Sequence, residues 1–513
     1  MGSVARPPSA AAICYDGEMT PRELLSGLYQ FDDECNVYVV VRGGGAVAID
    51  FGSGRWLDQY ATSGLPTIEH VFLTHHHSDQ CAGLEGRSDW PFVIHAPIGD
   101  LPSISPQGVA DYWQHRSDAG VPRSYDVLRR GIEHVSFDMA GFSDMIWRGG
   151  RVRCIHTPGP TRTAISVLMD IGRKQVLFCG DAAHAGATIH KPYMLEWDHW
   201  TGEGALAAFE GVERMRGLGI DLLCPAHGPV VTDSIRPMLG SLSKRLLDLY
   251  RVKGSICAGE RDRYVTPTWT DDGALRITPG LYSTGGNTYV LQSASGEVMV
   301  VDPWRGENDA LRALLEKLGN PRITAATATH YHADHCDMLN AMRDEFGALV
   351  LLHPRVAQPI ADPGSLDVPW LPKEPIRADQ AWPGEGNWSW NEYTFDIAPL
   401  AGQTWWHCGF CVTIDGVKVA FTGDSFQPPS RWNGTGGFCS FNGSRFETGF
   451  VRSARRVMAW KPNIIAAGHG TFVHYRASYF RKVIHWAARA EAAVKALCPS
   501  GRLEDDYYRH NHR

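Results

Sequence analysis

The chain has 513 residues, of which 43% are hydrophobic and 20% are charged, a composition typical of globular proteins. A formal net charge of −7 and the lack of a clustered Lys/Arg stripe argue against nucleic acid as a partner. The amino terminus lacks the apolar core of a signal peptide, and no run of about 18 apolar residues occurs, so we expect a cytoplasmic protein without membrane contact. The length exceeds the range of a single hydrophobic core and predicts two domains.

The first half of the chain contains strand-like runs that end in acidic or histidine-containing loops. Runs at 37–41 and 46–49 flank a glycine turn and lead to Asp50, which predicts a β-hairpin. The apolar run at 71–73 precedes a cluster of potential ligands. This cluster reads His75, His76, His77, Ser78, Asp79 and Gln80. Later runs end at Asp181 and His227, and periodicity at 205–215 and 235–252 predicts helices around the last strand.

The second half repeats this order. Runs at 288–291 and 298–301 lead to Asp302, and a run at 323–328 precedes a second cluster. That cluster reads His330, Tyr331, His332, Ala333, Asp334 and His335. Later runs end at Asp424 and His469, with helices predicted at 447–460 and 479–497. The two clusters lie 255 residues apart, which is too long for a solenoid repeat, so we infer that a whole domain is duplicated.

Strands that alternate with helices predict a layered α/β fold for each domain. We expect a first domain at 12–257 and a second at 276–500. Residues 258–275 are polar and rich in turn formers, so we expect them to form a linker. Residues 501–513 are expected to form a polar tail.

The second histidine cluster gathers residue types that bind metal ions. An isolated histidine pair is more often a pair of hydrogen-bonded imidazoles, but here four ligand side chains fall within six residues. Imidazoles and carboxylates suit zinc, iron or manganese, and ligands on loops at strand ends leave an open position for water. We expect one or two divalent metal ions, with zinc as the leading candidate.

The motif His-x-His-x-Asp-His, a later Gly-Asp and a final Gly-His-Gly, each at a strand end, resemble the metallo-β-lactamase superfamily. The resemblance covers nearly the whole chain, once per half, and implies two tandem αββα sandwich domains with a mono- or dinuclear metal site at one edge. It implies His330 and His332 as ligands of a first metal, Asp334, His335 and His469 as ligands of a second, and Asp424 as the bridge. Asp334 and Asp424 are then the expected catalytic residues, with Asp334 also placed to accept a proton.

The first metal site departs from the family pattern. The family has its third histidine for this metal in a Gly-His-Thr turn, where this chain has Gln403. A glutamine oxygen is an uncommon zinc ligand, so His407, four residues later, is a candidate replacement. Spacing alone does not decide whether His407 binds the metal or supports a ligand or the substrate.

The amino-terminal copy is less complete. It retains His75, His77, Asp79, Asp181 and His227. Gln80 replaces the last histidine of the motif and Pro160 fills the turn position. We expect His156 and His184 to be polar neighbours of the site, with substitution for the missing ligands as the alternative. Because ligands are lost from both metal sites, we expect no catalytic dinuclear centre in this half, although a single-metal site there stays open. This half could pack against the second half, roof its active-site edge, or mediate a homodimer.

The expected activity is hydrolysis by a metal-bound hydroxide in the second domain. A small ester, lactone, amide, thioester or phosphoester is the expected substrate, with Arg431, Trp432 and Trp405 as candidate substrate-binding residues. A diiron oxygenase or oxidoreductase is the first alternative, and a non-catalytic, metal-stabilised binding or scaffold protein is the second.

Overall fold

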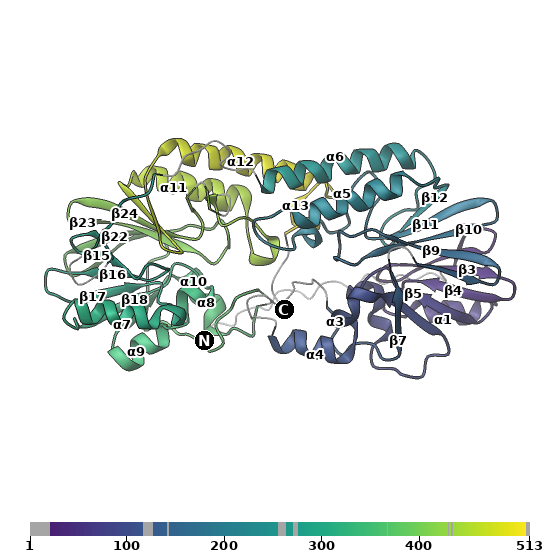
Figure 1. The fold of residues 1–513 in the computed structure, drawn as a ribbon, viewed down its shortest axis with the longest axis horizontal. Helices are drawn as coiled ribbons and strands as arrows, with labels where there is room; N and C mark the ends of the chain where they lie inside the picture. The colour runs from purple at the N-terminus through teal and green to yellow at the C-terminus, as the bar shows by residue number, and fades with distance from the viewer. Residues whose placement is uncertain are drawn as a thin grey trace, which may run out of the picture.

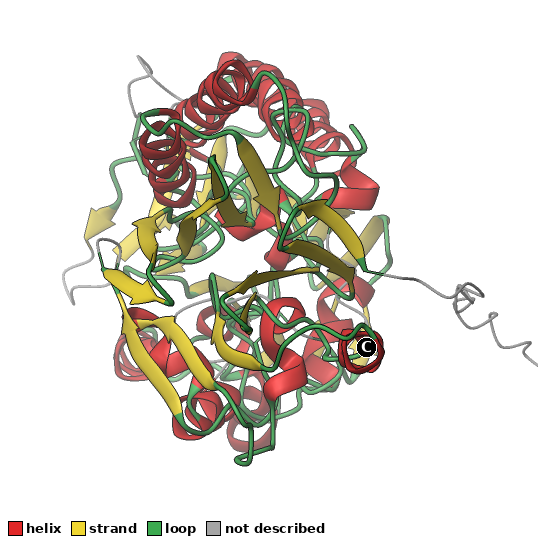
Figure 2. Ribbon diagram, turned by 90° about the vertical axis from the view of Figure 1, so that its right-hand side faces the viewer, coloured by secondary structure: helices red, strands yellow, loops and turns green. Residues whose placement is uncertain are grey.

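The computed structural model describes residues 21–115, 127–140, 143–254, 263–269, 275–366, 368–428, 430–431 and 434–508. These residues form an N-terminal half (21–254) and a C-terminal half (263–508) that lie side by side (Figure 1). Seen from one end, two layers of strands lie between outer layers of helices (Figure 2). This confirms the predicted pair of αββα sandwiches.

The N-terminal half contains two sheets. The first has the order β1 (Arg22–Leu25), β2 (Leu28–Asp32), β3 (Asn36–Arg42), β4 (Gly45–Ile49), β5 (Ile68–Phe72), β6 (Val93–Pro97) and β7 (Val135–Met139). The second has the order β12 (Leu222–Pro225), β11 (Lys174–Gly180), β10 (Ile165–Ile171), β9 (Gly150–His156) and β8 (Asp144–Trp147). Strands β4 to β7 run parallel to one another, as do β11 and β12, and the other neighbouring strands pair antiparallel.

The C-terminal half repeats this topology. Its first sheet has the order β13 (Thr268–Trp269), β14 (Leu275–Thr278), β15 (Leu281–Ser283), β16 (Tyr289–Gln292), β17 (Val298–Val301), β18 (Ile323–Thr327), β19 (Leu349–Leu352) and β20 (Gln380–Ala381). Its second sheet has the order β21 (Gly386–Trp390), β22 (Tyr393–Pro399), β23 (Cys408–Ile414), β24 (Val417–Gly423), β25 (Ile464–Ala467) and β26 (Thr471–His474). Parallel pairing again runs from β17 to β20 and between β24 and β25. The shared pattern supports duplication of one domain.

Helices cover the outer faces of both sandwiches. In the N-terminal half they are α1 (Trp56–Thr62), α2 (Ser78–Cys81), α3 (Leu101–Ile104), α4 (Pro106–His115), α5 (Glu203–Arg216) and α6 (Ile235–Lys253). In the C-terminal half they are α7 (Asn308–Lys317), α8 (Ala333–Cys336), α9 (Leu339–Phe346), α10 (Pro354–Ala361), α11 (Arg452–Trp460), α12 (Ala477–Lys495) and α13 (Leu503–Asp506). Among the described residues, no helix has both the length and the apolar character needed to cross a bilayer.

Burial on both faces explains the strand sequences near the sites. Strands β4 and β17 are buried at every residue and consist mainly of valine, alanine and isoleucine, as expected for strands covered on both sides. Each ends at an aspartate with a positive φ, 57° at Asp50 and 53° at Asp302. Aspartate tolerates this left-handed conformation better than most residues, and the turn directs its carboxylate to the loop that carries the histidine cluster.

A continuous hydrophobic core joins the two halves. Helices α5 and α6 lie beside α11 and α12 along one side of the molecule (Figure 1), and their apolar residues belong to one buried cluster. The indole of Trp486 on α12 donates a 2.7 Å hydrogen bond to the carbonyl of Val252 on α6. The N-terminal half therefore packs against the C-terminal half, one of the roles expected from the sequence.

The expected linker and tail are partly built into the C-terminal half. Within 258–275, Val265 donates a 3.0 Å backbone hydrogen bond to Phe472, and β13 pairs with β14. Within 501–508, α13 forms and Leu503 and Tyr507 are buried, because their side chains complete the shared core. The described part of this segment is therefore a packed element and not a polar tail.

We expect Tyr507→Phe to lower the free energy of unfolding by about 1–3 kcal/mol. The Tyr507 hydroxyl donates to the buried carboxylate of Glu196 in the N-terminal half, and the substitution leaves that acceptor without this donor. Thermal unfolding would measure the effect, with Tyr264→Phe, at an exposed tyrosine, as the control. Equal melting temperatures for the two variants would contradict this account of the interface.

Candidate metal centre

The C-terminal site is built at one edge of the sandwich, where central strands of both sheets end. Strand β18 leads into His330 and His332, and α8 then carries Asp334 and His335. Strand β24 ends directly before Asp424. Strand β25 ends two residues before His469. The fold therefore brings together ligands that are far apart in the sequence.

The first ligand group contains His330, His332 and Asp424, all three buried. His330 Nε2 lies 2.9 Å from His332 Nδ1, and one ligand atom from each of the three residues lies within 4.8 Å of the others. Two imidazole nitrogens this close, next to a carboxylate, form a donor set that suits a divalent transition metal.

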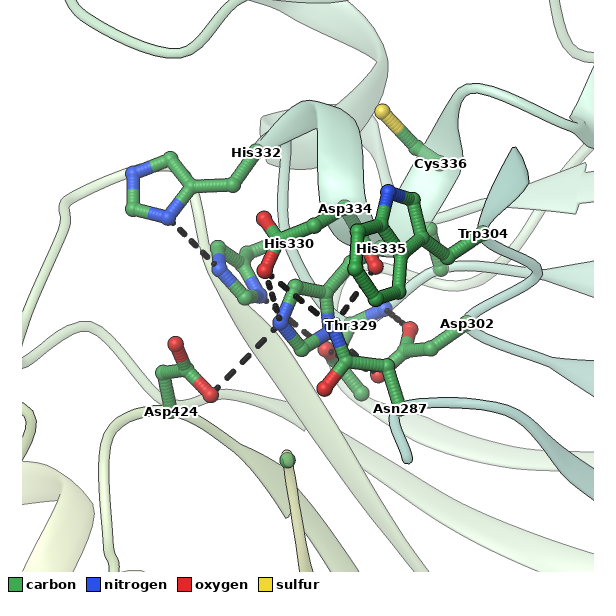
Figure 3. Close-up of polar contacts among 12 residues, drawn as sticks. Asn287, Asp302, Trp304, Thr329, His330, His332, Asp334, His335, Cys336 and Asp424 are labelled. Carbon is green, nitrogen blue, oxygen red and sulfur yellow. Dashed lines mark hydrogen bonds and ion pairs between the residues drawn. The ribbon is translucent and has the colours of Figure 1, made fainter. Parts of the chain in front are cut away.

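The second group contains Asp334, His335 and His469. His335 Nε2 lies 3.7 Å from Asp334 Oδ2 and 3.6 Å from Asp424 Oδ1 (Figure 3). His469 Nε2 lies 3.1 Å from Asp424 Oδ2. Asp424 therefore faces both groups, which is the position required of a bridging ligand.

Hydrogen bonds to the opposite ring nitrogens orient these imidazoles. His335 Nδ1 contacts Asp302 Oδ2 at 3.0 Å, and His330 Nδ1 contacts Thr329 Oγ1 at 3.2 Å. His332 Nε2 contacts Asn442 Oδ1 at 3.1 Å. With these nitrogens assigned as donors, His330 Nε2 and His332 Nδ1 present lone pairs to the first group, and His335 Nε2 faces the carboxylates of Asp334 and Asp424.

Two asparagines that the sequence analysis did not identify support the site. Asn287, just before β16, donates from its amide to Asp334 Oδ2 at 3.1 Å, and its Oδ1 accepts the backbone N–H of His469 at 2.6 Å. Asn442 accepts from His332 as described above. No spacing rule marks a single asparagine in a loop, so only the tertiary structure identifies both.

Charges around His335 show that the site favours a cation. Burial alone would lower the pKa of His335, but Asp334, Asp424 and Asp302 outweigh it and raise the pKa to about 10. Burial would raise the pKa of Asp424, but His469 and His335 hold it well below its ordinary value. The Asp424 carboxylate therefore stays ionised and attracts positive charge.

Buried polar atoms without hydrogen-bond partners provide a test of whether a metal ion fits this site. His335 Nε2 and Gln403 Oε1 are buried and have no hydrogen-bond partner within the described part of the chain. Burial lowers the pKa of His332 to about 4, so its imidazole is neutral near pH 7, the form that binds metals. The donor set, the ionised Asp424 carboxylate and these unpaired atoms fit divalent metal ions.

Gln403 and His407 occupy different positions relative to the ligand groups. The Gln403 amide nitrogen lies 3.4 Å from Asp424 Oδ2, and the residue lines a cavity at the site. His407 is fully buried and lies outside both ligand groups; its ring stacks on His330 with 4.8 Å between centroids. The structure therefore brings Gln403 to the Asp424 carboxylate and places His407 against His330.

A cavity of about 700 Å³ opens onto the ligand groups. Its lining includes His332, Asp334, Asp424 and His469. Three indoles also line it, those of Trp200, Trp304 and Trp370. A volume of this size is in the range of small-molecule sites in proteins.

The residues predicted to bind substrate lie elsewhere or outside the described chain. Trp405 packs beneath the Arg355 guanidinium, 3.9 Å from the ring centroid, and does not line this cavity because it faces α10. Arg431 donates a 2.7 Å hydrogen bond to the carbonyl of His469 and so supports the ligand loop. Trp432 lies outside the described residues.

The N-terminal half holds two comparable groups. The first contains His75, His77 and Asp181, with His75 Nε2 3.1 Å from His77 Nδ1. The second contains Asp79, His190 and His227. His190 was not predicted, because it lies on a loop beyond Asp181 with no family spacing. Its ring stacks on that of His227 with 3.6 Å between centroids.

The second N-terminal group differs from its counterpart in charge. Lys191 Nζ lies 3.3 Å from Asp79 Oδ2, so an ammonium group already neutralises this carboxylate. Gln80 stands where the other half has the His335 imidazole that contacts Asp302. Burial raises the pKa of Asp50, the counterpart of Asp302, to about 8. The position is therefore less suited to a second metal ion.

The candidate substitute histidines of this half lie outside its two ligand groups. His156 Nε2 contacts the carbonyl of Arg162 at 3.1 Å. His184 Nδ1 contacts the carbonyl of Ala185 at 3.0 Å. Pro160 is buried in the turn and offers no ligand atom. Neither His156 nor His184 therefore substitutes for a missing ligand in these groups.

Two solved structures are similar to less than half of the chain. A B3 metallo-β-lactamase with an active-site glutamic acid is 18% identical and covers 45% of this chain and 90% of its own, with a TM-score of 0.35. An archaeal metallo-β-lactamase superfamily protein from Sulfolobus tokodaii is 23% identical and covers 43% and 86%, with a TM-score of 0.33.

Curated relatives are also similar over less than half of the chain. An atrochrysone carboxyl ACP thioesterase from Aspergillus terreus is 22% identical over 232 residues, which are 44% of this chain and 59% of that protein. A protein of the same description from Cryptosporiopsis is 24% identical over 215 residues, 41% and 54% respectively. A lactamase-like protein, nscB, from Neosartorya fischeri is 26% identical over 203 residues, 39% and 49%. The chain thus spans about half the length of the curated relatives it matches.

A sequence profile that represents the whole family gives the broadest match. The profile of the metallo-beta-lactamase superfamily matches residues 31–227 and, separately, residues 282–469. The two matches cover more than half of the chain and coincide with the two sandwiches. The chain therefore belongs to the metallo-β-lactamase superfamily, with one copy of the family domain in each half.

Proposed function

We propose that the protein is a metal-dependent hydrolase whose active centre lies in the C-terminal half, and that its substrates are thioesters of small acyl groups. The observation that carries the proposal is the convergence of the two ligand groups, joined by Asp424, at a cavity large enough for a small molecule. Zinc is the proposed metal, since its preferred ligands match the donor set.

The residues around this centre can perform the remaining steps of hydrolysis. Bound divalent metal ions supply hydroxide near neutral pH and polarise a carbonyl oxygen. The Asp334 side chain keeps 32% of its surface exposed and lines the cavity, while Asn287 fixes one of its oxygens. Asp334 is therefore placed to accept a proton from the attacking water and to transfer it to the leaving group.

A thioester substrate is supported by the relatives and by the cavity. Two of the similar curated proteins are named as thioesterases of substrates on an acyl carrier protein. The cavity combines indole surfaces with polar groups at the ligands, which would suit an acyl group whose carbonyl lies beside the two ligand groups.

The N-terminal half is proposed to carry no catalytic centre. Lys191 beside Asp79 supplies positive charge where a second metal ion would bind, and Gln80 offers no imidazole. Electrostatic competition of this kind lowers the affinity for a divalent cation at the second group.

The matched variants Asp424→Asn and Asp181→Asn test this assignment. We expect Asp424→Asn to lower kcat/KM for thioester cleavage by about 100-fold or more and to reduce bound metal, because an amide is a poor bridging ligand. Asp181→Asn should change the activity by less than about threefold. Thiol release from acyl N-acetylcysteamine thioesters and elemental analysis would measure both effects.

Equal loss of activity in the two variants would place catalysis in both halves and contradict the assignment. Bound iron together with a visible absorption band would favour the diiron alternative. Full activity after exhaustive removal of metal by a chelator would exclude a metal-dependent mechanism.

Asp334→Asn separates the proton-accepting role from metal binding. An asparagine retains one oxygen as a ligand but loses the basic carboxylate, so we expect turnover to fall about 100-fold. Metal content should fall by a smaller factor. Parallel measurement of kcat and metal per chain would test this, and retained turnover would rule out Asp334 as the proton acceptor.

Gln403→His tests the departure from the family pattern. Because Gln403 lies next to Asp424, an imidazole at this position should add a ligand to the first group and slow metal loss to a chelator by about tenfold. Gln403→Ala is the control for loss of the amide alone. Unchanged metal retention in Gln403→His would show that position 403 does not contact the first metal.

A further inference from the structure

The cavity of the C-terminal half is walled in part by the N-terminal half. Of the described residues that line it, only Trp200 comes from the N-terminal half, and this residue is 37% exposed. Trp200 follows the 3₁₀ turn Pro192–Leu195 and precedes α5. The segment 196–201, here called the crossing segment, therefore brings the N-terminal half to the site of the proposed chemistry.

Hydrogen bonds within the crossing segment and from Lys253 hold its conformation. The Asp198 carboxylate accepts the backbone N–H of Trp200 at 2.9 Å, which fixes the turn that presents the indole. The buried ammonium group of Lys253, at the end of α6, donates to the carbonyls of Asp198 at 3.1 Å and Phe438 at 3.2 Å. One cation thus links the crossing segment to the C-terminal half.

Two hydrogen bonds from backbone N–H groups of the C-terminal half also fix the position of the crossing segment. Phe438 donates its backbone N–H to the His199 carbonyl at 2.8 Å, and Ser440 donates its own to Glu196 Oε2 at 2.7 Å. A side chain at Gly437, which has a φ of 75°, would collide with the His199 carbonyl. The glycine therefore permits a close approach of the two backbones.

The crossing segment also reaches the metal ligands. The His199 ring packs against Trp370, with 4.4 Å between centroids, and lies 6.3 Å from the ring of His332. Trp200, Trp304 and Trp370 all line the cavity, together with apolar Leu371 and Ile376. Rigid indole surfaces favour flat ring systems, because stacking on them gains contact area at little cost in conformational entropy.

We propose that Trp200 is a specificity-determining residue, through which the N-terminal half selects acyl groups that carry a planar aromatic ring. The proposal rests on the proposed function, since it names the acyl group of the thioester cleaved in the C-terminal half. It gives the N-terminal half a role in substrate binding that requires no metal in that half.

Kinetics with two thioesters test this selection in the full-length metal-loaded protein. With naphthoyl N-acetylcysteamine thioester, Trp200→Ala should lower kcat/KM by about tenfold, mainly through KM, and Trp200→Phe should retain most of the activity. With the butanoyl thioester, Trp200→Ala should change kcat/KM by less than about threefold. Trp269→Ala, at a tryptophan that is 67% exposed in β13, is the matched control and should affect neither substrate.

An equal change for both thioesters, or no change for either, would overturn the proposal. If the wild-type protein cleaves neither thioester, the proposed function fails, and calorimetric titration with naphthoate then tests the inference separately. We expect naphthoate to bind Trp200→Ala about tenfold more weakly than wild type, with metal content and melting temperature unchanged. Equal affinity of the two proteins, or no binding to wild type, would rule out Trp200 as an aromatic-binding residue.

Discussion

The position of His335 between two carboxylates is the interaction on which the rest of the site depends. Its Nδ1 lies 3.0 Å from Asp302 and its Nε2 lies 3.6 Å from Asp424. One imidazole thereby connects the end of β17 in the first sheet with the end of β24 in the second. In the N-terminal half Gln80 stands at the position of His335, so this imidazole link is missing. The Lys191 ammonium group neutralises the Asp79 carboxylate.

The two halves show that the fold and the metal site are separable. Both sandwiches keep their strand pairing and a buried apolar core between the sheets, although their ligand sets differ. Burial of apolar surface stabilises each half and does not depend on residues such as Gln80 or Pro160. A duplicated domain can therefore lose ligands and retain its architecture, while its surface contributes Trp200 to the neighbouring cavity.

The sequence predicted the features that are local or repeated. Helices expected at 235–252 and 479–497 form within two residues of those limits, and the family match confirms the two-domain α/β fold. Residues that reach the site through tertiary packing could not be predicted. Asn287, Asn442 and His190 belong to no spacing pattern, and Trp200 reaches the cavity only because the halves pack together. Trp405 was expected at the substrate, but the turn directs its ring towards Arg355.

Anomalous X-ray scattering at the zinc and iron edges, from crystals of the protein as purified, tests the central claim most directly. The account predicts metal peaks in the C-terminal half, one among His330, His332 and Asp424 and one among Asp334, His335 and His469. It predicts no peak between Asp79 and His227, where Lys191 lies. A peak at that N-terminal position, with none at Asp424, would contradict the assignment of the metal centre to the C-terminal half.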